Sequence, residues 1–170
     1  MDNKLKNDYE NLLRSLKDRY CRLLLVTGDS EQKVKTLAQV WDQGISPLQV
    51  SRALSAILVD ASLSMRPQTV LDFFANFVNQ SEILFLSDIE ILFDRSLNID
   101  PLKLLKQTAR NRSIIVNWPG KIDFNANLLT YATPGHSEYF EADLTDDILF
   151  WDESGRNSLN YEGTGGNHEI

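Results

Sequence analysis

Two acidic side chains follow an apolar segment closely enough to act together. Residues 83–86 form an unbroken apolar run, Asp88 stands two residues after it, and Glu90 two residues further on. Such a run is typical of a strand buried on both faces, and if the strand persists, side chains two apart project to the same side. Asp88 would then position a magnesium ion through a water, and Glu90 would polarise an attacking water as a general base. The alternative is a polar strand end that caps the helix after it.

The segment 28–36, Gly-Asp-Ser-Glu-Gln-Lys-Val-Lys-Thr, contains parts of a phosphate-binding loop. In G-x-x-x-x-G-K-[ST], glycines turn backbone N–H groups toward the phosphates, the lysine reaches the outer phosphates, and the hydroxyl binds magnesium. With one inserted residue, Gly28, Lys35 and Thr36 match. They are the candidate nucleotide-binding residues, and Thr36 is also a candidate magnesium ligand. The alternative is that Gly28 only turns the chain into a helix.

The same segment departs from a working phosphate loop in two ways. Val34 stands where the second glycine belongs, and a β-branched residue resists positive φ. Asp29 and Glu31 would bring negative charge toward a phosphate, which costs about 1 to 4 kcal/mol at roughly 4 Å. We therefore favour weak or absent nucleotide binding by this loop.

A polar residue also ends the second long apolar run. Asn117 follows residues 113–116, as expected of a sensor that hydrogen-bonds an attacking water or the last phosphate, although strand-ending asparagines are also common in turns. Arg110 and Arg112 could reach across a subunit boundary, but we interpret them as a solvated helix end. Asn117 therefore joins Glu90 as a candidate catalytic residue.

The elements that must position these residues alternate between helices and strands. Apolar residues recur at helical spacing over residues 1–20, 50–61 and 70–78 and from Pro101, and a further helix begins near Lys33. Short apolar runs predict strands at 23–26, 83–86, 113–117 and 128–132. Alternation of this kind predicts an α/β protein in three layers with a mostly parallel central sheet, whose ligands bind beyond the carboxyl ends of the strands.

Composition predicts one domain with two appendages. We expect an amphipathic helix over 1–20 packed on the domain, the domain itself over 21–140, and a tail over 141–170. The tail is rich in Asp and Glu and, from Ser154, in Gly and Asn, so we expect it to be disordered.

Charge and composition exclude several classes of function. Seventeen Lys and Arg face twenty-four Asp and Glu, and a net charge of -7 disfavours sequence-independent binding to nucleic acid. One cysteine with two histidines offers neither an internal disulfide nor a zinc pattern. No apolar stretch approaches the roughly 20 residues of a membrane span, so we expect no membrane contact and a cytoplasmic protein.

From Ser46 to about Phe140 the chain resembles BrxF, the small P-loop protein family of type 3 BREX bacteriophage-exclusion systems. The order and spacing of short motifs over more than half the chain carry the resemblance. They are Val50-Ser51-Arg52-Ala53-Leu54, Ser87-Asp88-Ile89-Glu90-Ile91-Leu92-Phe93-Asp94 with Leu97, Asp100-Pro101-Leu102, Arg110-Asn111-Arg112, Val116-Asn117-Trp118-Pro119-Gly120, and Thr130-Tyr131-Ala132 through Pro134-Gly135-His136, Glu138 and Tyr139.

The resemblance implies a P-loop NTPase-like fold, ATP and magnesium as ligands, and other proteins of the BREX complex as partners. Asp88 would then occupy a Walker B position. Because only Gly28 and Lys35-Thr36 remain of the family's loop, the expected activity is at most a weak ATPase. The alternative is a non-catalytic adaptor that keeps the scaffold and docks a defence partner through its N-terminal helix or its acidic C-terminal segment.

Overall fold

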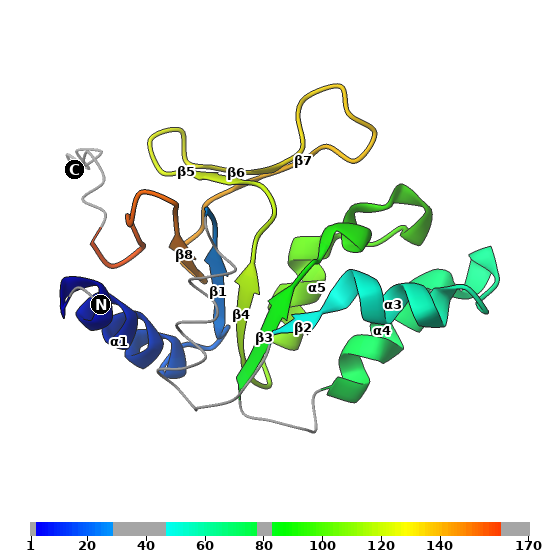
Figure 1. Cartoon of the computed structure of the whole chain (residues 1–170), viewed down its shortest axis with the longest axis horizontal. Helices are drawn as coiled ribbons and strands as arrows, with labels where there is room; N and C mark the ends of the chain where they lie inside the picture. Colours follow the sequence, from blue (N-terminus) through cyan, green and yellow to red (C-terminus); the bar gives the residue numbers. More distant parts are fainter. Residues whose placement is uncertain (1–2, 29–46, 78–82, 161–170) are drawn as a thin grey trace, which may run out of the picture.

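A five-stranded parallel sheet forms the centre of the molecule. The computed structural model describes residues 3–28, 47–77 and 83–160. The strands lie in the order β2-β3-β4-β1-β8, and every neighbouring pair is parallel (Figure 1). Their bounds are Leu23–Val26 for β1, Leu48–Gln49 for β2, Ile83–Ser87 for β3, Ser113–Asn117 for β4 and Leu149–Trp151 for β8. The predicted α/β class with a mostly parallel sheet is confirmed.

Helices pack on both faces of this sheet (Figure 1). The helix predicted over 1–20 spans Asn3–Lys17 as α1, and its apolar residues pack against Leu24 and Val26 of β1. On the opposite face α3 (Val50–Leu58), α4 (Arg66–Phe77) and α5 (Pro101–Thr108) cover Leu23 and Leu25. Because successive side chains of one strand enter different cores, β1 must be apolar throughout, as its sequence is.

Short helical turns and a capped helix connect the strands on that second face. The turns are η1 (Leu63–Met65), η2 (Glu90–Phe93) and η3 (Arg95–Leu97). The α5 helix begins as predicted at Pro101, and the Asp100 carboxylate accepts a hydrogen bond from the Lys103 N–H at 3.0 Å. The helix expected from Lys33 lies outside the described residues.

A small antiparallel sheet lies over the carboxyl edge of the parallel sheet (Figure 1). It contains β5 (Lys121–Asp123), β6 (Leu128–Tyr131) and β7 (Phe140–Asp143) in that order. The strand predicted at 128–132 therefore exists but belongs to a second sheet. The Trp118 indole ties the two sheets together by donating to the Thr130 carbonyl at 2.9 Å.

The expectation of a disordered tail from residue 141 was wrong for residues 141–160. Part of β7 and all of β8 lie there, and Leu149, Phe150 and Trp151 are each at most 2% exposed. The acidic residues fall mainly in the loop before β8 and in the turn after it. The acidic composition of the segment therefore outweighed the short apolar run of β8, which completes the sheet beside β1. Residues 161–170 lie outside the described residues.

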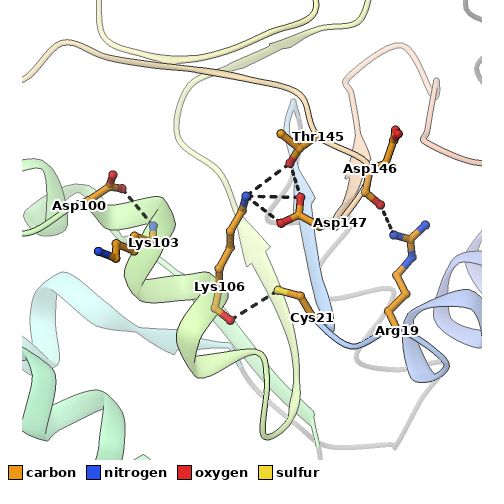
Figure 2. A network of polar contacts seen from close by, with 8 residues as sticks. All are labelled: Arg19, Cys21, Asp100, Lys103, Lys106, Thr145, Asp146 and Asp147. Atoms are coloured by element: carbon orange, nitrogen blue, oxygen red, sulfur yellow. Dashed lines mark hydrogen bonds and ion pairs between the residues drawn. The ribbon is translucent and has the colours of Figure 1, made fainter.

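Polar contacts hold the loop of residues 144–148, which precedes β8, against the rest of the domain (Figure 2). The Lys106 ammonium lies 3.0 Å from the Asp147 carboxylate, and the Arg19 guanidinium donates to the Asp146 carbonyl at 2.6 Å. Burial alone would raise the pKa of Asp147, but hydrogen bonds from Thr145 and Lys106 and the charge of Lys106 hold that pKa below its ordinary value.

None of the helices in the described ranges has the length and apolar character needed to cross a membrane.

Candidate functional site

Three of the predicted site residues lie at the ends of neighbouring strands or just after them, at the same edge of the sheet. Val26 of β1 lies opposite Asn117 of β4, and Leu86 of β3 lies opposite Val116 of β4. Gly28 follows Val26 by two residues, and Asp88 follows Leu86 by two. The carboxyl edge therefore brings together the ends of β1, β4 and β3 in that order.

The chain also reverses direction across the sheet at this place. After β1 it reappears in β2 at one edge of the sheet, whereas after β4 it passes through the small sheet and enters β8 on the other side of β1. Neighbouring strands whose connections depart in opposite directions leave a crevice beyond their carboxyl ends, where open α/β sheets bind ligands.

Gly28 occupies a position that only glycine fits. Its φ is +87°, and a Cβ built there would lie 2.4 Å from the Glu153 Cβ and 2.7 Å from the Glu153 Cα. Just before it, the Thr27 N–H donates to the Trp151 carbonyl at 3.0 Å. The turn after β1 is therefore pressed against the segment after β8, which accounts for the glycine without requiring a ligand.

Asp88 sits in a strained turn held by the first turn of α3. The strand ends at Ser87, and Asp88 has a left-handed φ of 52°, which is uncommon for a residue with a side chain. Its carbonyl accepts the Ser51 N–H at 2.6 Å, and the Ser51 hydroxyl accepts the Ile91 N–H at 3.1 Å. The strand does not persist to Glu90, which was the condition for both carboxylates to project to one side of a strand, because Glu90 begins η2 instead.

The turn nevertheless brings the two carboxyl groups into contact. Burial, a hydrogen bond with the Asp88 carboxyl and the negative charge of Asp88 raise the pKa of Glu90, although a hydrogen bond with its own backbone opposes the change. Glu90 keeps an exposed surface. A carboxyl group with a raised pKa and access to solvent suits proton transfer, and two adjoining carboxylates favour a cation.

Asn117 is half-buried at the end of β4 and precedes a buried aromatic cluster. Trp118 is 1% exposed and lies edge-to-face with Phe93, which stacks on Tyr131 with a centroid separation of 3.9 Å. Burial, followed by the charges of Glu138 and Glu90, raises the pKa of Tyr131. This cluster fixes η2 and β6 beside the acidic turn.

Asp152 is an acidic residue at this edge that sequence reasoning missed. It is 7% exposed and directly follows β8, beside Thr27 in the continued register. Its carboxylate accepts hydrogen bonds from the Ser154 N–H at 2.9 Å, the Ser154 hydroxyl at 2.7 Å and the Arg156 N–H at 3.0 Å. An acid close to the end of an apolar run was the available signal, as it was for Asp88.

Other candidates are placed differently or not at all. Lys35 and Thr36, the predicted phosphate and magnesium ligands, lie outside the described residues. Arg112, interpreted as part of a solvated helix end, is instead 2% exposed in the connection from α5 to β4, and burial lowers its pKa.

Comparisons with protein-family models, curated proteins and solved structures found no significant match to this chain.

Proposed function

We propose that this chain binds ATP with magnesium at the carboxyl edge of its parallel sheet and serves as a cytoplasmic P-loop subunit of a BREX defence complex. One observation carries the nucleotide part of the proposal. Strand order and register put the turn glycine Gly28, the polar residue Asn117 and the acidic residue Asp88 at the ends of three adjacent strands, at the switch point of the sheet. The defence partners rest on the resemblance to BrxF.

The proposed roles follow from the chemistry of each side chain. Lys35 and Thr36 would hold the phosphates, while Asp88 and Thr36 would support magnesium, which prefers carboxylate, hydroxyl and phosphate oxygens. The adjoining Asp88 and Glu90 carboxyls fit this assignment because together they favour a cation. Bound magnesium would supply charge neutralisation for the phosphates.

The remaining polar groups would act on water and on the terminal phosphate. Glu90 would accept a proton from the attacking water, and Asn117 would hydrogen-bond that water or the phosphate. The valine in the phosphate loop removes one of the expected glycines. We therefore propose that the nucleotide is bound weakly and that its hydrolysis is slow or absent.

A thermal-shift titration tests the binding proposal. ATP at 100 times its Kd should stabilise the protein by about 2.7 kcal/mol, which raises Tm by roughly 5 to 11 °C for a chain of this size. Lys35→Ala and Asp88→Asn should lose the shift, while Asp60→Asn, an exposed residue after α3, should keep it. An unchanged Tm of the wild-type protein in saturating ATP and magnesium would exclude the proposal.

A second candidate function is a non-catalytic adaptor, and exposed apolar side chains favour it. Val59, Leu63 and Met65, between α3 and the start of α4, are 79%, 67% and 54% exposed. The two docking elements expected from the sequence are otherwise engaged, because the apolar face of α1 is buried and β8 of the C-terminal segment is part of the sheet. We therefore assign partner docking to the turn between α3 and α4. Under this proposal ATP leaves Tm unchanged, and capture of BREX proteins survives Lys35→Ala but fails with Leu63→Asp. Capture that survives Leu63→Asp would contradict it.

A further inference from the structure

We infer that a cavity at the amino end of β1 binds a small ligand that carries a phosphate group. The cavity has a volume of about 310 Å³, within the range of small-molecule sites. Cys21, two residues before β1, is part of its lining, so the cavity lies at the edge of the sheet opposite the candidate ATP site. The inference therefore adds a second site and does not rest on the proposed function. The lining residues are Arg19, Tyr20, Cys21, Lys106, Arg110 and Asp147.

The basic residues of the lining come from separate elements and converge on one point. Arg19 follows the end of α1, Lys106 lies in the last turn of α5, and Arg110 follows that helix. The negative ends of the two helix dipoles favour each cation separately. Burial raises the pKa of the Cys21 thiol, as does the charge of Asp147, whereas the three cations lower it, so all of these charges lie near the thiol. In Figure 2 Cys21 lies between the side chains of Lys106 and Arg19.

Two of the three cations keep an uncompensated charge. The Lys106 ammonium is paired with the Asp147 carboxylate at 3.0 Å. Arg19 donates to a backbone carbonyl, which is uncharged, and its Nε has no hydrogen-bond partner among the described residues. Arg110 is exposed, and its Cζ lies 5.7 Å from the centroid of the Tyr20 ring. Within the described ranges neither arginine forms an ion pair, so the cavity has a net positive lining.

Arginine and phosphate match in both geometry and charge. The planar guanidinium presents parallel N–H donors that fit two oxygens of one phosphate, and a phosphate monoester carries about -1.5 to -2 charges at pH 7. Such a group balances both unpaired arginines, whereas one carboxylate balances only one. The whole chain has a net charge of -7, so an anion site needs a local excess of cations of this kind. The exposed Tyr20 ring offers apolar surface to an organic group esterified to the phosphate.

The single cysteine of the chain reports on occupancy of the cavity. N-ethylmaleimide is uncharged and alkylates the Cys21 thiol, and mass spectrometry measures the rate of alkylation. The probe is pyrophosphate, added at constant ionic strength in EDTA, which withholds the magnesium required by the proposed ATP site. At about ten times its Kd, pyrophosphate should slow alkylation roughly tenfold, because only the free protein reacts. Calorimetric titration under the same conditions should give the same Kd.

Two arginine variants locate the bound anion. Arg110→Gln removes one charge-assisted hydrogen bond, so the Kd for pyrophosphate should rise about tenfold. The side chain of Arg110 is exposed, so the variant should fold. Arg95→Gln, in the exposed turn η3, removes the same charge outside the cavity and should leave the Kd unchanged.

Three results would overturn the inference. The first is no binding of pyrophosphate to the wild type, or the same Kd in Arg110→Gln. The second is binding that Lys35→Ala abolishes and Arg110→Gln retains, which would assign the anion to the candidate phosphate loop. The third is protection of Cys21 by a tetraglutamate peptide without protection by pyrophosphate, which would assign the cavity to carboxylates of a polypeptide. The thermal shift with ATP and magnesium bears only on the proposed function.

Discussion

Replacing Gly28 by alanine should destabilise the protein more than the same change at another left-handed glycine. Gly155 has φ +89° and nothing within 4 Å of a built Cβ, so Gly155→Ala pays only for backbone conformation, about 1 to 2 kcal/mol. Gly28 has φ +87°, and its built Cβ lies 2.4 Å from the Glu153 Cβ. Relieving that contact requires backbone movement, at about 1 to 3 kcal/mol more. The total for Gly28→Ala is about 2 to 5 kcal/mol.

Urea denaturation followed by circular dichroism measures both variants without any ligand. With a slope of about 2 kcal/mol per M, the midpoint should fall by roughly 0.5 to 1 M for Gly155→Ala and by roughly 1 to 2.5 M for Gly28→Ala. The measurement is made without nucleotide for one reason. If Gly28→Ala lost ATP binding, that result could reflect either a lost phosphate contact or disturbed local packing.

Equal midpoints for the two variants would refute the reasoning. They would mean that the turn after β1 and the segment after β8 do not press together, and that the geometry of the candidate crevice is different.

Three further predictions concern other parts of the fold. Trp151→Ala, in a side chain 1% exposed, should lower the free energy of unfolding by about 3 to 5 kcal/mol in urea, whereas Leu159→Ala, 47% exposed, should change it by at most about 0.5; equal effects would remove β8 from the core. Because the folded pKa of Asp147 lies below 3.8, its ion pair stabilises the protein fully above that pH and is lost as pH falls through the folded pKa. Asp147 is half-exposed, so Asp147→Asn should cost about 0.2 to 1 kcal/mol at pH 6 and progressively less as pH falls below 3.8, and a cost that does not vary with pH would contradict the ion pair. Asp88→Asn should lower the pKa of Glu90 in a carbon-13 NMR titration, because it removes a neighbouring negative charge, and an unchanged pKa would show that the carboxyls do not interact.

The long apolar runs predicted the centre of the sheet well. The strands at 83–87 and 113–117 lie where their sequences indicate, because a strand with both faces covered must be apolar along its length. The parallel direction of the strands then followed from the alternation of elements, and with it the shared carboxyl edge of Gly28, Asp88 and Asn117, whereas the order of the strands came only from the structure.

Short elements in polar surroundings could not be predicted in the same way. The three residues of β8 are apolar, but the acids around them dominate any average over the segment. The left-handed turn at Asp88 depends on the hydrogen bond from Ser51, which lies far away in sequence. Burial of Arg112 likewise depends on the packing of several elements. Such features arise from tertiary contacts that no local pattern encodes.

The late position of β8 in the chain affects how the protein is made. During translation, β1 and β4 leave the ribosome long before residues 149–151, yet β1 needs β8 to complete its hydrogen bonding. A nascent chain therefore carries an unpaired apolar edge, open to chaperones or to other chains, until residue 151 has emerged. Because the segment after β8 packs against the turn at Gly28, this carboxyl edge of the sheet is complete only after residue 153 has emerged.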